Sequence, residues 1–396
     1  MSRQRRAIFQ LILGVVAALV TSIFLAAPPF LIPTLTLDLA LDLATAGLIA
    51  VLPNLGLVSM LVIWGGLADR FGERGVLLAG LGLTTLAAFG AVSASSPPVL
   101  GIWLLLGGMA SASANVATGR IVIGWAPLRR RGLVMGIRQM AIPLGVMVAA
   151  TAVPPLAQSH GISGAMLLPA LACALVLPWC LFGLRNPPRT NSETPRAQAK
   201  APTNPYKMSG YLYRVHAAST ALAVPQFALQ IFGLVWLMEG LEWTAVAAGA
   251  VVGSAQFLGA IGRVIVGAWS DSRGRMKIIR LVSAAGVLTL LLLGFSAYLR
   301  WDTLAVGLFI MATGLSVADN GPAFTAVAEH AGPFWSGRAL GVQNTMQHFA
   351  GFLVGPTVGA LLEHLNFPLM LALLALAPAI ALRLVPKQDR HYDATS

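Results

Sequence analysis

Charged residues are scarce in this sequence. Asp, Glu, Lys and Arg make up 10% of the 396 residues, whereas 57% are apolar and the mean hydropathy is +0.78. A soluble globular domain carries about 25% charged residues, so that class of protein is excluded. The apolar share suffices for roughly twelve helices of about 20 residues, the length that crosses a bilayer. The sequence therefore predicts an integral membrane protein.

Cysteines and catalytic motifs are also scarce. The two cysteines, Cys173 and Cys180, share one apolar run, and on a helix their Cα atoms would lie about 10 Å apart, too far for a disulfide. The sequence has no HExxH, no Gly-x-Ser-x-Gly, no phosphate-binding Gly-x4-Gly-Lys-Ser/Thr and no paired CxxC. We therefore expect neither an enzyme nor an ATPase, and no cofactor or metal.

Basic residues are unevenly distributed between the apolar runs. To within a few residues, these runs are 7–33, 45–68, 75–94, 98–124, 133–157, 162–184, 211–238, 245–269, 277–299, 302–328, 338–362 and 367–386. With a cytoplasmic N-terminus, the inner segments hold 22 Lys and Arg, and the outer segments hold one, Arg300. Cytoplasmic loops carry such an excess, so both termini are expected in the cytoplasm. The net charge of +12 thus reports topology, and no nucleic-acid partner is expected.

A polar, Pro-rich segment divides the chain. Residues 185–210 contain few large apolar residues, which predicts a flexible cytoplasmic linker. The linker would separate an N-terminal six-helix bundle, residues 1–184, from a C-terminal six-helix bundle, residues 211–396.

The two halves also repeat. GGLADRFGER at 65–74 recurs as GAWSDSRGRM at 267–276, and RGLVMGIRQ at 131–139 recurs as SGRALGVQN at 336–344. The offsets, 202 and 205 residues, are nearly equal. Two matches at one offset predict a pseudo-twofold axis along the membrane normal.

The first repeated motif lies between the second and third spans. Its residues are Gly65, Asp69, Arg70, Gly72 and Arg74, and the second copy retains Gly267, Asp271 and Arg275. This pattern resembles the signature loop of the major facilitator superfamily. The resemblance covers the whole chain and implies an all-α membrane protein with 12 transmembrane helices in two pseudo-symmetric six-helix bundles.

Asp69 is the candidate gating residue of this loop. Its carboxylate could accept hydrogen bonds at the N-terminus of a facing helix, where the helix dipole favours negative charge. Such a contact can form in one conformation and break in another. The alternative is a short charged turn that only marks topology.

Arg263 lies deep in the eighth predicted span, eight residues before Asp271. A charge at that depth must face protein or water. The pattern Gly262-Arg263-x-x-x-Gly267-x-x-x-Asp271 resembles the eighth span of the monocarboxylate and oxalate/formate carriers, which implies that Arg263 binds a substrate carboxylate. The alternative is a structural ion pair with Asp271 or Asp319. Those monocarboxylate carriers have an acidic residue one turn earlier, where this sequence has Gly259, so that coupling role cannot be transferred.

Asp319 is the acidic residue expected nearest the bilayer midplane. It is a candidate proton carrier, because a carboxylate there would respond both to burial and to a nearby arginine. A fixed counter-ion and a hydrogen bond at the helix bend beside Gly321-Pro322 are the alternatives. His348 is a second candidate for the proton, and the alternative is a buried packing histidine, which is the commoner role of a lone histidine.

Further polar residues fall on the inner helices of both halves. Arg138 would supply a second positive charge, and a group of amides would bind the substrate by hydrogen bonds. Interhelical hydrogen bonding could explain any single amide. The amides are Gln226, Gln230, Gln256, Gln343, Asn344 and Gln347.

The expected function is secondary active transport of a small, monocarboxylate-like organic anion, coupled to protons, by rocking of the two bundles around a central site. The alternative is efflux of a drug or metabolite by proton antiport, although the fifth span lacks the exporter pattern Gly-x-x-x-Gly-Pro-x-x-Gly-Gly. A non-transporting sensor would be expected to add an output domain. We expect a monomer in the plasma membrane, which is the inner membrane if the source is a Gram-negative bacterium.

Overall fold

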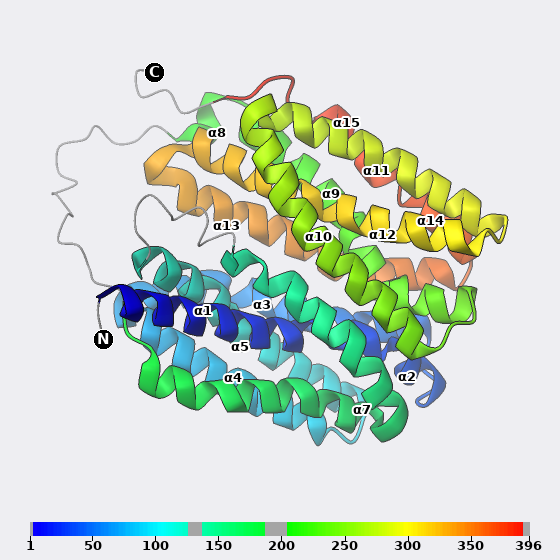
Figure 1. Ribbon diagram of the computed structural model, residues 1–396, viewed down its shortest axis with the longest axis horizontal. Coiled ribbons are helices and arrows are strands. Elements are labelled where there is room, and N and C mark those ends of the chain that lie inside the picture. Colours follow the sequence, from blue (N-terminus) through cyan, green and yellow to red (C-terminus); the bar gives the residue numbers. More distant parts are fainter. Residues whose placement is uncertain (1–2, 126–136, 187–203, 391–396) are drawn as a thin grey trace. The chain divides into compact units, whose positions relative to one another are not determined.

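All regular structure in the described residues of the computed structural model, 3–125, 137–186 and 204–390, is helical (Figure 1). The all-α prediction is therefore confirmed. The helices before the linker are α1 (Arg3–Ala26), η1 (Pro28–Leu31), α2 (Ile32–Leu37), α3 (Leu43–Phe71), α4 (Glu73–Val92), α5 (Pro97–Trp125) and α7 (Ala141–Gly183). Those after it are α8 (Pro205–Met208), α9 (Tyr211–Val235), η4 (Trp236–Gly240), α10 (Ala245–Arg273), α11 (Arg275–Tyr298), α12 (Asp302–Ala318), α13 (Asn320–Leu362), α14 (Phe367–Leu373) and α15 (Leu376–Leu384).

Ten helical stretches among the described residues are long and apolar enough to cross a membrane. The chain is therefore a multi-pass membrane protein. The helix α7 has 43 residues, about 65 Å of helix against a hydrocarbon core of about 30 Å. It is broken at Gly161, whose φ of 66° and ψ of −166° are not helical, so its two arms match two of the predicted runs. The helix α13 also has 43 residues, and Figure 1 shows it doubling back. The number of twelve crossings remains a prediction.

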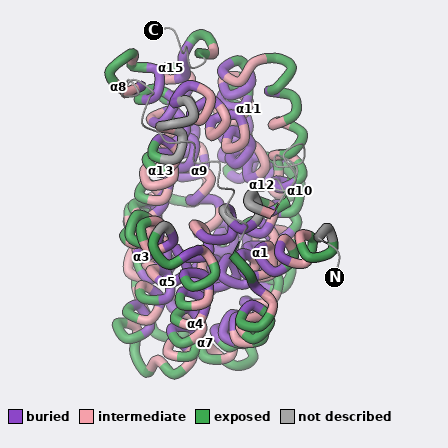
Figure 2. Tube along the Cα trace, turned by 90° about the vertical axis from the view of Figure 1, so that its left-hand side faces the viewer, coloured by how far each residue is buried: buried purple, intermediate pink, exposed green. Residues whose placement is uncertain are grey.

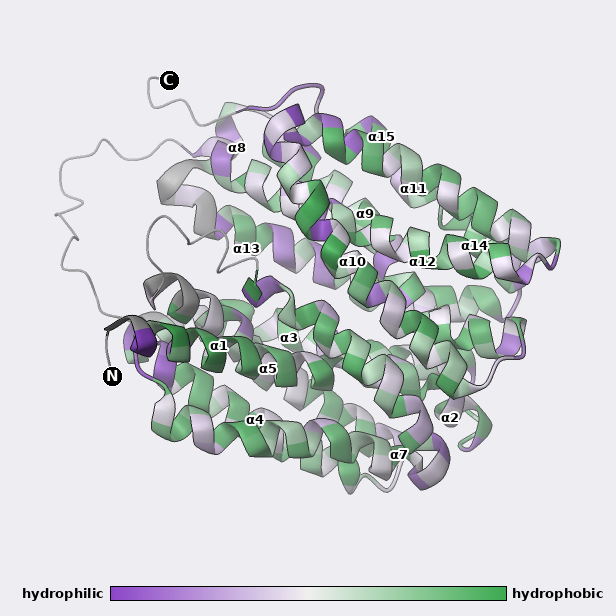
Figure 3. Cartoon of the chain, in the orientation of Figure 1, coloured by the Kyte–Doolittle hydropathy of each residue, from purple (hydrophilic) through white to green (hydrophobic). Residues whose placement is uncertain are grey.

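The long helices reverse the usual amphipathic pattern, and α11 illustrates this. Its exposed side chains include Leu288, Leu291 and Phe295, whereas Ser283 and Ser296 are buried. Figure 2 shows buried and exposed positions along the helices, and Figure 3 shows that the long helices are hydrophobic along most of their length. Large apolar groups on the outside and small polar groups inside are what a lipid environment favours.

The described chain forms two compact units. The first comprises residues 1–190 and 237–256, and the second comprises 191–236 and 257–396. The start of α10 groups with the first unit, where Gly249 lies against the carbonyl oxygen of Ala150 in α7. Most of the predicted linker, residues 187–203, lies outside the described residues, and α8 is a short helix that the composition did not predict. The six-plus-six division stays a prediction.

In each unit, glycines allow two helices to pack closely at an equivalent place in the repeat. In the first unit, a Cβ atom on Gly56 of α3 would lie 2.1 Å from the carbonyl oxygen of Leu105 in α5. A Cβ atom on Gly108 of α5 would lie 2.1 Å from the carbonyl oxygen of Pro53. Any larger residue would push these helices apart. In the second unit, Gly259 of α10 and Gly314 of α12 face each other at a less close distance, with the Gly314 Cα atom 3.6 Å from a Cβ atom built on Gly259. These pairs are 203 and 206 residues apart, so the sequence repeat extends to helix packing.

Candidate functional site

Arg263 emerges from the centre of a glycine seam, which we define as Gly259 and Gly267 of α10 against Gly314 and Gly321 of α12 and α13. The Cα atom of Gly314 lies 3.6 Å from a Cβ atom built on Gly259, and the Cα atom of Gly267 lies 3.7 Å from one built on Gly321. Arg263 is four residues, about one turn, from each α10 glycine. The seam therefore fixes the arginine backbone against the α12–α13 junction, where Asp319 lies.

The Arg263 side chain keeps an unused donor. Its Nε atom is buried and has no hydrogen-bond partner among the described residues. Arg263 and Asp319 lie within electrostatic range of each other, but neither forms an ion pair in the described part of the chain. A buried donor without a partner is costly. An anionic group brought to Arg263 would remove this cost.

Asp319 is buried, with 1% of its surface exposed, at the junction between α12 and α13. Its Oδ2 atom accepts a hydrogen bond from the Ser219 hydroxyl of α9 at 3.0 Å. The Gln347 Nε2 atom of α13 donates both to Ser219 at 2.7 Å and to the Asn320 Oδ1 atom at 3.0 Å. Asn320 in turn donates to the Gln226 Oε1 atom of α9 at 3.2 Å. We call these five residues the Asp319 network. It joins α9 and α13 around one buried carboxylate at the α12–α13 junction.

The other predicted residues of α13 have different surroundings. Gln343 is fully buried, and its Oε1 atom contacts the Nδ1 atom of His216, whereas its Nε2 atom has no partner among the described residues. His348 packs its ring 6.0 Å from the Phe227 ring, and its buried Nδ1 atom also lacks a partner in the described chain. Asn344 donates to the carbonyl oxygen of Leu340 on its own helix, so its amide is engaged locally. The predicted common face of these residues is thus only partly a shared site.

Gln230 is half-buried on α9, one turn beyond Gln226. Gln256 is buried in α10, seven residues before Arg263, and belongs to the first unit. Neither residue is joined to the Asp319 network by a hydrogen bond within the described residues.

Arg138 is buried in the first unit and differs from Arg263 in being fully engaged. Its Nε atom donates to the Thr118 hydroxyl at 3.1 Å, and its NH1 atom donates to the Gln139 Oε1 atom at 2.7 Å. Its NH2 atom donates to both the carbonyl oxygen and the Oδ1 atom of Asn115 at 3.1 Å. All these acceptors are neutral. Arg138 is therefore a buried positive charge held in a fixed orientation by α5.

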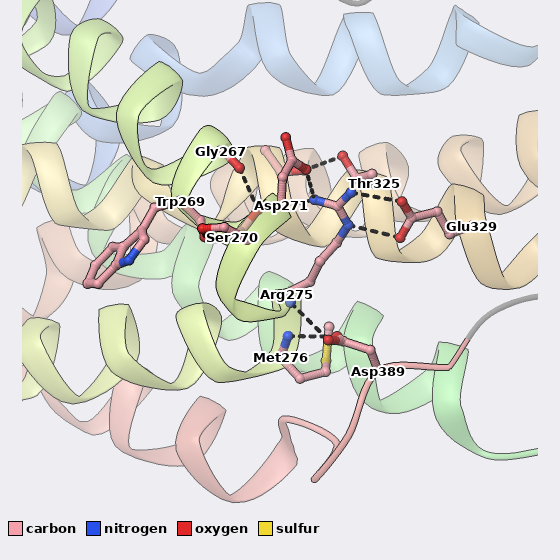
Figure 4. A network of polar contacts seen from close by, with 11 residues as sticks. Gly267, Trp269, Ser270, Asp271, Arg275, Met276, Thr325, Glu329 and Asp389 are labelled. Atoms are coloured by element: carbon pink, nitrogen blue, oxygen red, sulfur yellow. Dashed lines mark hydrogen bonds and ion pairs between the residues drawn. The ribbon is translucent and has the colours of Figure 1, made fainter.

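The second copy of the repeated motif forms an ion-pair network (Figure 4). Arg275 binds Glu329 of α13 through two hydrogen bonds of 2.9 and 2.8 Å and binds Asp271 of α10 at 2.7 Å. Gly267 lies in the glycine seam described above. This copy therefore ties α10, α11 and α13 together at one end of the second unit.

The first copy is described only in part. The side chain of Asp69 lies outside the described residues, so its gating role stays a prediction. Arg70 is exposed above the Phe71 ring, and Arg74 donates to the carbonyl oxygen of Leu181 at 2.9 Å. Gly65 faces open space in the described chain, with no atom within 4 Å of a Cβ built there. Gly72 has a φ of 82°, which favours glycine.

Three members of the polar surroundings were missed from the sequence: Ser219, Asn320 and His216. Ser219 precedes Gln226 by seven residues, which places both on one face of α9, and Asn320 follows Asp319 directly. The helical spacing could therefore have found Ser219. No sequence pattern pairs His216 with Gln343. Among the described residues, no group of three His, Cys, Asp or Glu side chains could hold a metal ion.

The chain has clear relatives. A sequence model described as Major Facilitator Superfamily matches residues 11–356. An uncharacterized MFS-type transporter of Mycobacterium tuberculosis is 42% identical over 385 residues, which cover 96% of this chain and 85% of that protein. A gallate transporter of Pseudomonas putida is 26% identical over 403 residues, which cover 91% of this chain and 87% of that protein.

Solved structures share the fold. A bacterial homologue of the human lysosomal transporter Spinster has a TM-score of 0.77 at 14% identity, with 95% of each chain covered. A D-xylose–proton symporter also has a TM-score of 0.77 at 14% identity, with 96% of this chain and 98% of that chain covered. At such low identity, these likenesses concern the fold alone.

Proposed function

This chain belongs to the Major Facilitator Superfamily and is a membrane transporter of that type, and from that premise we propose that it carries a small organic anion, coupled to protons, by alternating access. The twelve crossings and two six-helix bundles predicted from the sequence are part of this proposal. The substrate would be monocarboxylate-like.

The observation that carries the proposal is the unused Nε donor of Arg263. Because the glycine seam packs α10 against α12 and α13, the backbone of Arg263 has little freedom to move. A guanidinium stays charged and matches a carboxylate with two parallel hydrogen bonds. The gallate transporter relative supports an organic anion, since gallate is a carboxylate.

Asp319 would carry the coupled proton. It is a buried carboxylate within electrostatic range of Arg263, so an anion bound to Arg263 would favour the protonated form of Asp319. Binding of anion and proton would then be mutually favourable, which is the requirement for symport. His348 is the second candidate. Arg138 would contribute long-range positive charge, because its hydrogen-bond donors are already engaged within the first unit.

Transport assays with purified protein in liposomes test this proposal. We expect uptake of labelled carboxylates, gallate among them, to be driven by an inwardly directed proton gradient. Arg263→Gln should abolish uptake, whereas Lys387→Gln, which removes an exposed charge, should not change it. Proton-driven expulsion of an amine or neutral drug, with full activity in Arg263→Gln, would instead support the efflux alternative.

We propose that both termini are cytoplasmic and that the membrane is the plasma membrane, the inner one in a Gram-negative cell. The distribution of basic residues supports this orientation. A cysteine at position 300 should react with an impermeant reagent added outside intact cells, and one at position 196 should not. The reverse pattern would invert the topology.

A further inference from the structure

His216 connects a residue beyond the membrane helices to the interior of the second unit. It lies in α9 with 1% of its surface exposed. Its Nε2 atom lies 2.9 Å from the Tyr206 hydroxyl of α8, and its Nδ1 atom contacts the Gln343 Oε1 atom of α13. Tyr206 is only half-buried, so the contact with His216 begins at a residue that reaches solvent.

The contact between His216 and Gln343 is the first of two polar contacts between α9 and α13. One turn along both helices, Ser219 pairs with Gln347, and Ser219 donates to Asp319. The order from solvent to the buried carboxylate is therefore Tyr206, His216, Ser219 and Asp319. Between the His216–Gln343 contact and the Ser219–Gln347 contact lies the amide of Gln343, whose buried Nε2 atom has no partner among the described residues. Such a donor favours a bound water.

The two contacts define the protonation of His216. An amide oxygen only accepts hydrogen bonds, so Nδ1 of His216 carries the proton, and Nε2 accepts one from the Tyr206 hydroxyl. Partial burial raises the pKa of Tyr206, and the neighbouring Tyr213 adds to this, so the hydroxyl remains protonated and able to donate. Nε2 of His216 is thus the one basic nitrogen of the ring, and its hydrogen-bond partner is the Tyr206 hydroxyl.

Among the described residues, the contacts of His216 are with uncharged side chains. From α8 it faces Tyr206, whose ring stacks at 5.9 Å, and from α13 it faces Gln343. Trp335 of α13 reaches it only through Tyr206, at 6.5 Å between the aromatic rings. No carboxylate contacts His216 in the described chain, so no ion-pair partner fixes the charge of the imidazole.

We infer that His216 transfers protons between the cytoplasmic linker and Asp319, with Tyr206 as its hydrogen-bond partner on the linker side. A proton from cytoplasmic water binds Nε2, and the Tyr206 hydroxyl turns so that its oxygen accepts from the new N–H. The imidazolium then gives its Nδ1 proton, through a water beside Gln343, to the Asp319 carboxylate. One proton has moved, and His216 is neutral again with its proton on Nε2. Release to the cytoplasm is the reverse path: Asp319 returns its proton to Nδ1, Nε2 gives its proton to cytoplasmic water, and the Nδ1–H form is restored. This inference rests on the proposed proton coupling at Asp319.

Transport by variants separates the relay from the coupling itself. His216→Gln should lower gallate uptake driven by a proton gradient at least about tenfold, while gallate exchange without a gradient stays within about twofold of wild type. His364→Gln, at an exposed histidine, is the control. If Asp319→Asn loses gradient-driven uptake and His216→Gln keeps it, the relay is wrong and the coupling proposal stands. If wild type shows no gradient-driven uptake, the proposed function fails instead.

Two further measurements test the proposal if the His216→Gln protein fails to fold or if the substrate is not gallate. Tyr206→Phe removes only the half-buried hydroxyl and should shift the pH midpoint of uptake. In the purified protein without substrate, the NMR signal of the His216 ring should titrate between about pH 5 and 8, and Tyr206→Phe should shift that titration. A ring signal that does not change over this range, or that titrates identically in Tyr206→Phe, would overturn the relay.

Discussion

Asn186 and Asp389 hold equivalent positions in the two units. The Asn186 Oδ1 atom accepts a hydrogen bond from the backbone N–H of Arg74 at 2.8 Å. Asp389 accepts from the backbone N–H groups of Arg275 and Met276 at 3.0 and 2.9 Å. Each residue follows the last helix of its unit and caps the helix that begins after the repeated motif. They are 203 residues apart, so the internal repeat includes a capping contact that neither motif contains.

Gly72 and Gly274 are expected to be essential for these caps. Their φ values of 82° and 93° are strained for any residue with a side chain, and a Cβ atom would lie 3.0 Å from Asn186 and 2.8 Å from Asp389, respectively. Gly72→Ala and Gly274→Ala should each lower the free energy of unfolding by about 1–3 kcal/mol. Gly75→Ala, within helix α4 and facing open space, is the matched control. Thermal unfolding in detergent measures the difference, and equal effects at all three positions would contradict the assignment.

The glycine seam predicts a strong asymmetry between Gly259 and Gly262. A Cβ atom on Gly259 would lie 3.2 Å from the Val317 Cγ2 atom, whereas one on Gly262 would meet nothing within 4 Å. Gly259→Leu should therefore separate α10 from α12 and reduce uptake at least about tenfold, because a shift of about 1 Å at a binding site can cost a hundredfold. Gly262→Leu should retain uptake. Similar losses in both variants would mean that the seam does not position Arg263.

The relation between Arg263 and Asp319 is tested by a double-mutant cycle. If Arg263 binds the substrate, Arg263→Lys keeps the charge but loses the planar fork, so affinity should fall by about 1.5–3 kcal/mol, or ten- to roughly a hundredfold. The rival explanation is that Arg263 only neutralises Asp319. In that case each single neutral variant should be unstable, and Arg263→Gln combined with Asp319→Asn should restore stability. Ligand binding and thermal unfolding, measured together, distinguish the two.

Asp319→Asn is expected to uncouple transport from protons. Asparagine retains an oxygen that can accept from Ser219, so the Asp319 network should persist, but the side chain can no longer bind and release a proton. Gradient-driven uptake should be lost, and exchange of labelled for unlabelled substrate should remain. Uptake in this variant that still responds fully to pH would identify His348 as the better candidate for the coupling residue.

The long helices were predictable because each is an apolar run bounded by polar or Gly-containing segments, and the repeat was predictable because its loops keep their glycines and charges. The place of Arg263 on the glycine-lined face of its helix was also predictable, since Gly259 and Gly267 flank it at one-turn spacing. The contacts of polar side chains were not. Ser219 and Asp319 are 100 residues apart, and Asn344 satisfies its amide on its own backbone. Which amide meets which partner depends on how the helices are rotated, and no local pattern determines that rotation.

The close backbone contact along the glycine seam limits how substrate preference can change during evolution. A large side chain at Gly259 would meet Val317, and one at Gly321 would meet Gly267 and the carbonyl oxygen of Arg263, so such substitutions would disturb the packing around Arg263. The α9 residues Gln226 and Gln230 face no such restriction in the described chain. Under the proposed function, related carriers would diverge in the neutral part of the ligand they accept, through changes on α9, while keeping the same charged anchor.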